Sequence, residues 1–442
     1  MRILLFFLSL PVLTLQAQTR LPEVANVRGR SLGARSRESD SKSDWRLTPW
    51  LELSMRETYD NNIYTTSVGP LSNVSSIITE LKPTIGWSIA LGDHLQWKAA
   101  YQPDFTFYHH QEKESHQRHR WTLAGHQAIT ESLEMDLKAN TTWNRGSDAA
   151  PVWTEAGGAP AFGAYETRNR RNQFQVSYDA RLTQSLPHQF YLSGRLSGTY
   201  TDFQTKRDST PGLQIYYDRD EHLFGLDAGK KWQQKNSFFL GYRFGAQHQE
   251  PSENSGLHYS NTFHRMPLGL NLQPWTWLEL NVEAGPDWRD FSRGSYSSVS
   301  PENRIHVYVD CRVHIHITSS QECILSHRRF LVPSSGGYGM FEDITYDASW
   351  SILFGGKAEE TIKHFNGGWR FSTGFEIYEE DFFPAVRHER RYSPRLELEY
   401  IMNPHVRVGL DARHEWTASD IPGTPSREYQ RQVVGLRVNL IY

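Results

Sequence analysis

The sequence predicts an all-β protein, a transmembrane antiparallel up-and-down β-barrel, and three observations lead to this prediction. Apolar residues recur at every second position over many segments of roughly ten residues. Tight and long polar connections alternate between these segments. The chain ends on VVGLRVNLIY (433–442), an alternating strand with an aromatic last residue. Strands of about nine to eleven residues span a bilayer, whereas soluble sandwiches use strands of about five or six.

Composition argues against several classes of protein. The 442 residues carry a formal net charge of −3, without the basic excess that nucleic-acid binders usually have. No Gly-rich phosphate loop appears, and two cysteines are too few for a disulfide scaffold or a metal cluster. We therefore expect no nucleic-acid partner and no cofactor.

The amino-terminal segment has the features of an export signal. Arg2 precedes the apolar stretch ILLFFLSLPVL, and LQA (15–17) places a small residue before a cleavage point. We predict a signal peptide over 1–17, a flexible periplasmic leader over 18–47 and a barrel over 48–442. No second apolar stretch long enough for a membrane-spanning helix follows.

The predicted strands have two different faces and two kinds of connection. FQVSYDARL (174–182) and VYVDCRVHIHI (307–317) each alternate apolar with polar residues. Short connections such as TSSQ (318–321) alternate with long ones such as 145–169, as in transmembrane barrels. We count about 18 strands, with 16 as the alternative because 355–368 is long for a short turn. An even count places both chain ends on the periplasmic side of a bacterial outer membrane.

The last strand carries a first resemblance. Gly435, Val438, Leu440 and the terminal Tyr442 resemble the carboxyl-terminal signature of bacterial outer-membrane barrels. In that group the barrel-assembly machinery reads the last strand, which then seals the sheet against the first. The resemblance implies that these residues are an assembly signal as well as a strand.

A second resemblance lies at the end of the first predicted strand. RETYDNNIYTT (56–66) contains Tyr59, Asp60, Asn62, Ile63 and Tyr64. It resembles the stretch that opens the barrel porins associated with bacterial exopolysaccharide and exosortase systems. The resemblance implies a connection with saccharide or polysaccharide, while a polar Asx-rich loop after a strand explains the same residues.

The polar face of the strands carries charges of both signs. Such side chains need a watery lumen or ion-pair partners, and barrels of sixteen or more strands leave room for an aqueous channel. The leading hypothesis is a porin-like channel, surrounded by outer-membrane lipid, for passage or export of saccharide or polysaccharide. The predicted lumen-lining residues are Lys98, Asp104, Asp179, Arg181, Arg195, Arg243, Glu283, Asp310, Arg312, Arg328, Arg395, Arg407, Asp411, Arg413 and Arg437.

Two other functions are weighed against the channel. A non-conducting scaffold would use its long, Gly-rich loops to bind a partner or a surface polymer. A barrel enzyme such as a phospholipase or protease is less favoured. His258 and Ser260 have a His-x-Ser spacing that puts both side chains on one strand face, but no Asp or Asn can be assigned to orient the histidine. We predict no catalytic residues.

Histidines give no predicted metal site. One predicted loop contains His109, His110, His116 and His119. Imidazoles there could bind zinc or copper, but their irregular spacing favours a solvated loop. His306, His314 and His316 fall on the polar face and would line a pore, with satisfied polar side chains as the alternative.

The cysteines lie in one predicted hairpin. With its centre near residue 319, Cys311 lies opposite about residue 327 rather than opposite Cys323. A disulfide would need a register shift, which its narrow geometry disfavours.

Overall fold

The structure is a computed structural model that describes residues 45–65, 72–92, 94–146, 153–154, 160–161, 172–205, 217–233, 236–250, 258–292, 305–333, 339–356, 367–384, 387–420 and 428–442. The predicted signal peptide, and the leader up to residue 44, lie outside these ranges. The barrel begins at Trp45, just before the predicted start at residue 48.

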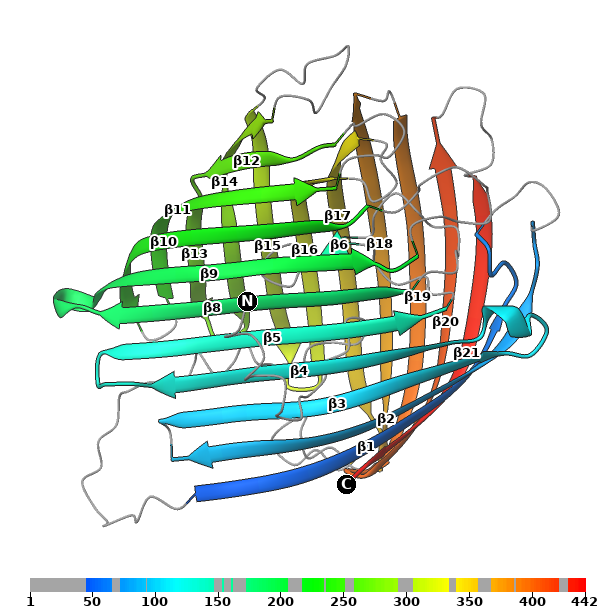
Figure 1. Ribbon diagram of the computed structural model, residues 1–442. Coiled ribbons are helices and arrows are strands. Elements are labelled where there is room, and N and C mark those ends of the chain that lie inside the picture. Colours follow the sequence, from blue (N-terminus) through cyan, green and yellow to red (C-terminus); the bar gives the residue numbers. More distant parts are fainter. Residues whose placement is uncertain are drawn as a thin grey trace.

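The described residues are almost entirely strands (Figure 1). The first half contains β1 (Trp45–Asp60), β2 (Ser76–Leu91), β3 (Leu95–Tyr108), β4 (His116–Ala128), β5 (Leu133–Arg145), β8 (Gln173–Ser185), β9 (Phe190–Phe203), β10 (Arg219–Gln233) and β11 (Asn236–Gln249). The second half contains β12 (Asn261–Arg265), β13 (Leu268–Trp275), β14 (Leu278–Phe291), β15 (Ile305–Thr318), β16 (Gln321–Pro333), β17 (Gly339–Phe354), β18 (Gly368–Pro384), β19 (Arg387–Asn403), β20 (Val406–Ser419) and β21 (Tyr429–Ile441). The short strands β6 (Trp153–Thr154) and β7 (Pro160–Ala161) pair with each other, and η3 (Glu112–Glu114) and η4 (Pro187–Gln189) are single 3₁₀ turns. Within the described ranges, no helix is both long and apolar enough to cross a membrane.

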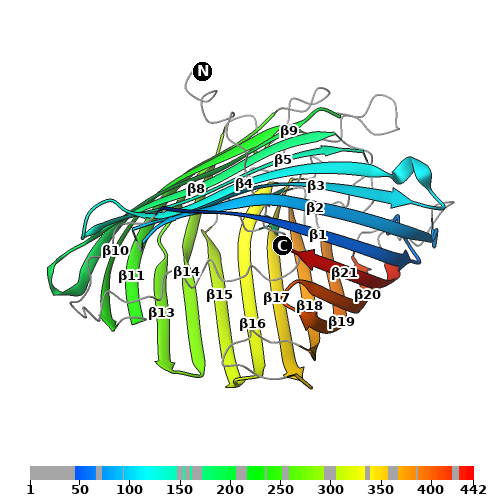
Figure 2. The same cartoon turned by 90° about the horizontal axis from the view of Figure 1, so that it is seen from below.

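The long strands form one closed antiparallel sheet (Figure 2). Neighbours in sequence pair with each other, and β1 pairs with β21, with Glu52 to Asp60 opposite Ile441 to Val433. β12 and β13 together make one crossing, since both pair with β11 and β14, so the barrel has 18 crossing strands. This confirms the predicted barrel and the count of 18 over 16.

The break between β12 and β13 has a local cause. Pro267 follows Met266 at the gap and has no N–H to donate to the ladder. Its carbonyl instead accepts a bond from Gly241 N–H at 2.8 Å, and Met266 N–H donates to Pro286 O at 3.0 Å. The crossing therefore continues through an irregularity rather than ending there.

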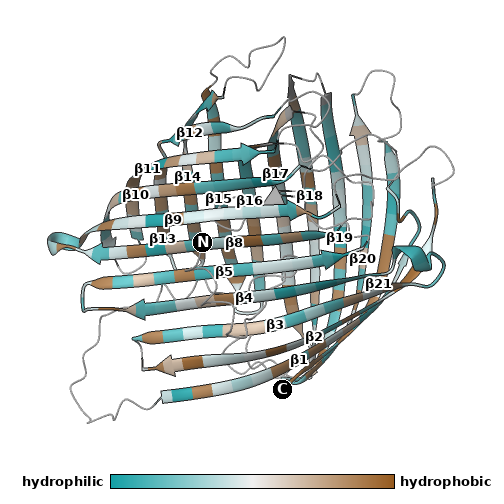
Figure 3. Ribbon diagram, viewed as in Figure 1, coloured by the Kyte–Doolittle hydropathy of each residue, from teal (hydrophilic) through white to brown (hydrophobic). Residues whose placement is uncertain are grey.

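Exposure of the side chains is the reverse of that in a soluble protein: apolar side chains are exposed and charged ones are buried. On β11, Leu240 is 64% exposed, whereas the side chain of Arg243 on the opposite face is 2% exposed. Apolar and polar residues alternate along the strands in the same way around the barrel (Figure 3). Large apolar side chains therefore cover the outer face, and polar and charged side chains are turned inward, as expected for a barrel surrounded by lipid.

The short connections lie where they are predicted, but one predicted loop is shorter. The connection over 331–343 is reduced because β16 continues to Pro333 and β17 begins at Gly339. Val332 and Phe341 are fully buried and pack with Phe382 from β18. These apolar residues extend both strands, whereas the Ser-Gly composition between them predicts a longer loop.

The YDNN residues (59–62), at the end of β1, connect the first strand of the sheet to the last. The carboxylate of Asp60 accepts hydrogen bonds from Arg431 on β21, with Nη2 at 2.6 Å. Asn61 N–H donates to Gln432 O at 3.2 Å, and Asn62 Nδ2 donates to Gln430 O at 3.0 Å. The Asx-rich stretch therefore binds β1 to β21 at the long-loop end of the seam, which is the pairing of these two strands.

Replacing Asp60 with Asn tests whether these contacts stabilise the barrel. The Asp60 side chain is 1% exposed and faces Arg431, so the neutral amide removes one of the two carboxylate partners of this guanidinium and leaves Glu415, at 3.2 Å. We expect Asp60→Asn to lower the free energy of unfolding by about 3–5 kcal/mol. The measurement is urea unfolding of the refolded barrel, followed by tryptophan fluorescence.

Asp136→Asn is the matched control, because the Asp136 side chain is 40% exposed and its ion-pair partner among the described residues is His126, at 3.0 Å. We expect this control to lose less than about 1 kcal/mol. Equal losses in the two variants would contradict a special role for the seam.

Candidate functional site in the barrel interior

Strand register places every predicted lumen-lining residue on the inner face of the sheet. For example, Arg181 lies opposite Arg195, and Asp310 lies between Glu283 and Arg328. This face lies opposite the exposed leucines and phenylalanines of the same strands. Some of the predicted residues gather in two ion-pair groups, and most of the others form separate ion pairs. A third group contains no predicted residue.

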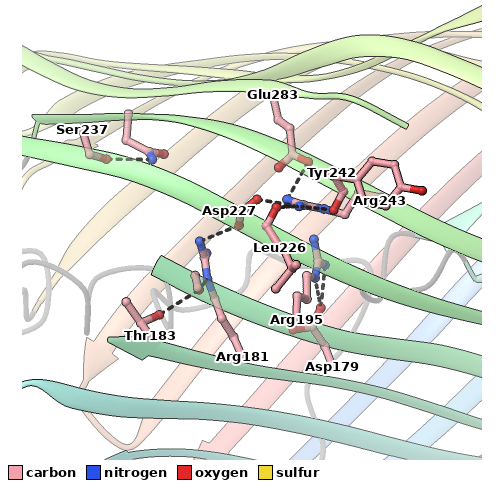
Figure 4. A network of polar contacts seen from close by, with 12 residues as sticks. Asp179, Arg181, Thr183, Arg195, Leu226, Asp227, Ser237, Tyr242, Arg243 and Glu283 are labelled. Carbon is pink, nitrogen blue, oxygen red and sulfur yellow. Dashed lines mark hydrogen bonds and ion pairs between the residues drawn. The ribbon is translucent and has the colours of Figure 1, made fainter. Parts of the chain in front are cut away.

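The first group connects β8, β9, β10, β11 and β14 (Figure 4). Asp227 accepts a hydrogen bond from Arg243 Nη1 and another from Arg181 Nη2, the latter at 3.1 Å. Arg243 Nη2 also lies 3.5 Å from Glu283 Oε1. Three predicted residues, Arg181, Arg243 and Glu283, thus form one connected chain of charges across the wall through one further carboxylate, Asp227.

A second pair in this group is built by neighbouring strands. Arg195 Nε donates to Asp179 Oδ2 at 2.9 Å. Arg181 Nε donates to Ser193 Oγ at 2.7 Å, which uses the remaining side of that guanidinium. These charges have opposite-sign or hydroxyl partners, so the wall accommodates them without a large local field.

Glycines make room for the first group. A Cβ at Gly225 would lie 2.7 Å from Cδ of Arg243, and a Cβ at Gly241 would lie 2.6 Å from Oδ1 of Asp227. The Arg243 side chain therefore lies flat over strands that have no side chain at the crossing points. This close approach explains why glycine occupies inner positions of β10 and β11.

The second group crosses the seam where the sheet closes. Arg56 on β1 donates to Asp411 on β20. Gly435 lies beneath this pair, because a Cβ there would be 2.8 Å from Arg56 Nε. On the neighbouring strands Arg437 donates to Glu397. Asp411 thus binds a partner on the first strand, and Arg437 of β21 binds a partner on β19.

Other predicted residues form separate inner pairs. These ion pairs join Asp104 with Arg118 at 2.7 Å, Arg395 with Asp347 at 2.6 Å, Arg413 with Glu415 at 3.1 Å and Arg328 with Asp343 at 3.9 Å. Among the described residues, Lys98, Arg312 and Arg407 have no oppositely charged partner within 4.0 Å. Lys98 and Arg312 are also exposed.

The third group was missed from the sequence. Asp287 accepts hydrogen bonds from Arg265 at 3.0 Å and from Arg289 at 2.9 Å. The Arg289 side chain is fully buried and also donates to Gln247 Oε1, at 3.0 Å. Its guanidinium lies 4.1 Å from the ring centroid of Phe263. The available signal was the alternation of Asp287 and Arg289 on one strand face.

The residues of the predicted assembly signal lie on both faces. Val438, Leu440 and Tyr442 share the outer parity, and Tyr442 is 85% exposed. Tyr442 N–H donates to Leu51 O at 2.7 Å, so the last residue is also part of the seam. Gly435 lies on the inner face, where its contact is the Arg56 side chain.

The His-x-Ser pair does not form a nucleophile and base pair within the described residues. The Ser260 hydroxyl donates to Gln249 O at 3.3 Å and accepts from Gln249 N–H at 3.1 Å. His248 Nδ1 lies 3.4 Å from this hydroxyl, and His258 Nδ1 faces Ser260 N–H at 3.4 Å. No carboxylate in the described part of the chain lies within 4.0 Å of either imidazole.

The four histidines of the predicted loop are dispersed. His116 and His119 belong to β4 rather than to a loop, because the alternating pattern begins at His116. His119 Nδ1 lies 2.6 Å from Tyr101 Oη, while its ring stacks on Trp143. His109 Nε2 lies 2.7 Å from Thr79 Oγ1. They do not share a common centre.

The two cysteines are free and separated by the strand register. Cys311 lies opposite His327, as predicted, and Cys323 lies opposite Ile315. Both are on the outer parity of the β15–β16 hairpin. The predicted register is confirmed, and it leaves the thiols unpaired.

A double-mutant cycle tests whether Arg243 and Asp227 act as one unit. Each single variant, Arg243→Met or Asp227→Asn, leaves a buried charge with fewer partners, so we expect a loss of about 3–5 kcal/mol. Because the residues are in contact, we expect the double variant to lose clearly less than the sum of the two. Urea unfolding measures all four proteins, and strict additivity would contradict the network.

Similar proteins were found among protein families and solved structures. Residues 368–442 match the model of a family described as putative beta-barrel porin 2. Among curated proteins, no significant match was found. Solved structures similar to the chain include OpdQ of Pseudomonas aeruginosa, at 9% identity and a TM-score of 0.42, with 90% of this chain and 97% of that chain covered. They also include opdK of the same organism, at 11% identity and 0.46, with 89% and 99% covered. OccAB3 of Acinetobacter baumannii has 11% identity and 0.44, with 89% and 99% covered.

The family match spans β18 to β21 and so includes the strand that closes the sheet. The matched segment also carries inner charges of the seam, among them Asp411 and Arg437. Together with the closed sheet of 18 strands, this match supports a bacterial outer-membrane barrel protein.

Proposed function

We propose that the chain forms a porin-like outer-membrane channel for hydrophilic solutes. The observation that carries this proposal is the inversion of the two faces, with apolar side chains exposed outside and ion pairs gathered inside. An apolar outer face is stable against lipid, and inner charges keep contact with water or with each other. Barrels of 16 to 18 strands leave an aqueous channel along their axis.

On β3 and β15, the exposure of the inner face changes along the strand. Lys98 near its short turn and Arg312 at mid-strand are exposed, whereas Asp104 and Tyr308, nearer the long loops, are buried. We propose that the lumen is wider at the short-turn end and narrows toward the long-loop end. Arg265 and Arg289, packed on Phe263, lie in the narrower part.

We propose saccharides as the solute class, which the resemblance of the Tyr59–Tyr64 stretch favours. The wall charges of opposite sign are paired with each other, as in Arg243 with Asp227. Paired charges offer many hydrogen-bonding groups with little net field, which suits neutral polar solutes.

The orientation and assembly of the chain are part of the same proposal. With both ends periplasmic, the short turns face the periplasm and the long loops face outward. Tyr442 lies exposed at the short-turn end, where the barrel-assembly machinery would meet it. Val438 and Leu440 would complete the recognised outer face of the strand.

Liposome swelling tests the saccharide proposal. We expect liposomes that contain the refolded barrel to swell in solutions of mono- and disaccharides, faster than protein-free liposomes, because the sugars enter with water. Larger oligosaccharides should swell them more slowly. A folded barrel that admits none of these sugars would contradict the proposal and favour a non-conducting scaffold.

Reversing the charge of Arg312 tests whether the inner face contacts the permeating solution. Arg312 is exposed and has no carboxylate partner within 4.0 Å among the described residues. We expect Arg312→Glu to shift the ion permeability ratio toward cations by roughly twofold or more at about 0.1 M salt, and by less at higher salt. The measurement is the reversal potential in a planar bilayer with a salt gradient.

The control variant is Arg390→Glu. Arg390 lies on the outer parity of β19, where Nε contacts Glu379 at 2.6 Å. We expect its reversal potential to match that of the unaltered protein. An equal shift in both variants would show that Arg312 acts through the global charge and not through the lumen.

A further inference from the structure

We propose that Glu279, His314, His316 and Glu322 bind a divalent transition-metal ion such as Zn²⁺ at the short-turn end of the inner face. One ligand atom from each of Glu279, His314 and His316 lies within 4.8 Å of the others. Imidazole nitrogens and carboxylate oxygens are ligands that zinc accepts. The site is argued from these side chains alone and does not depend on the proposed channel.

The register of three neighbouring strands assembles this set. His314 and His316 are two residues apart on β15, so both point to the inner face. Glu279 of β14 lies opposite His314, and Glu322 of β16 lies opposite His316. The two histidines are therefore flanked by one carboxylate on each side.

The closest contacts run along the diagonals of this arrangement. His314 Nε2 lies 3.0 Å from Glu322 Oε2, and His316 Nε2 lies 3.8 Å from Glu279 Oε1. The two imidazole centroids are 4.0 Å apart. Ligands at about 2.0–2.2 Å from a tetrahedral zinc ion are about 3.3 Å from each other. The ligand atoms of Glu279, His314 and His316 can therefore surround one ion after side-chain rotations, and Glu322 lies beside His314 as a fourth ligand.

Neighbouring polar groups hold the two carboxylates in place. Ser351 Oγ donates to Glu322 Oε1 at 3.0 Å, and Gln273 Nε2 donates to Glu279 Oε1 at 3.2 Å. Such outer hydrogen bonds orient metal ligands and raise metal affinity. In Glu322 the other oxygen, Oε2, faces His314, whereas in Glu279 the same oxygen faces His316.

The site is accessible from the short-turn end. An open pocket of about 330 Å³ lies beside it, lined in part by Trp277, His316, Gln321 and Glu322. The His316 side chain is 36% exposed. An ion can reach the ligands through this pocket, which also has room for a water ligand.

A contact between one histidine and one carboxylate, without a metal, is the alternative for each half of the set. His306 Nδ1 lies 2.9 Å from Glu342 Oε1, and this carboxylate also binds Arg329 at 2.6 Å. Within the described residues, His306 and Glu342 belong to no group with ligand atoms close enough for a metal. At His314 and His316, by contrast, two rings lie side by side between two carboxylates, and their nitrogens can share one cation.

Zinc titration of the refolded full chain by isothermal titration calorimetry tests the proposal. We expect the unaltered protein to bind Zn²⁺ at one site, and the double variant His314→Ala/His316→Ala to bind it at least about tenfold more weakly. His306→Ala is the matched control and should bind zinc like the unaltered protein. Circular dichroism and heat-modifiable gel migration establish that each variant is folded.

A second variant keeps the test decisive if the alanine variant does not fold. Glu279→Gln/Glu322→Gln preserves the size of both side chains and removes the anionic ligands, so it should also lose about tenfold or more in zinc affinity. Absence of zinc binding in the unaltered protein would overturn the proposal. Equal binding by the unaltered protein and a folded variant would also overturn it.

Discussion

The structure depends on the pairing of β1 with β21, because this pairing removes the free edges of the sheet. In lipid, an unpaired backbone N–H or C=O has no water partner and costs several kcal/mol. The ladder from Glu52–Ile441 to Asp60–Val433 satisfies these groups at the point where the chain ends meet. Arg431 with Asp60 at one end, and Arg56 with Asp411 farther along, add charged contacts across the same seam.

Closure in turn creates an interior in which charges must find partners. Arg243 and Asp227 are buried together, and the glycines beneath them let the arginine lie flat against the wall. Arg265 and Arg289 share Asp287 in the same way nearer the long loops. These pairs explain how a chain with many inward arginines forms a stable wall. They also leave Lys98, Arg312 and His316 on more accessible parts of that wall.

Much of this fold follows from local patterns in the sequence. Alternation predicts which face each side chain takes, and turn positions predict the strand order and the opposition of Cys311 and His327. Alternation does not predict which inward charges meet. Arg56 and Asp411 are 355 positions apart, and their contact depends on closure of the whole barrel. Likewise, His314 and His316 are adjacent in the pattern, but Glu279 and Glu322 join them only through the registers of two further strand pairs.

We propose that the charged interior surrounds a continuous aqueous path. Single-channel recording of the unaltered, refolded barrel in a planar bilayer measures whether ions follow this path. We expect stable, uniform current steps that scale with salt concentration, because ions would cross a water-filled lumen of fixed width. A barrel shown to be folded and inserted that never conducts would contradict it, since the ion pairs would then fill the interior as a solid core.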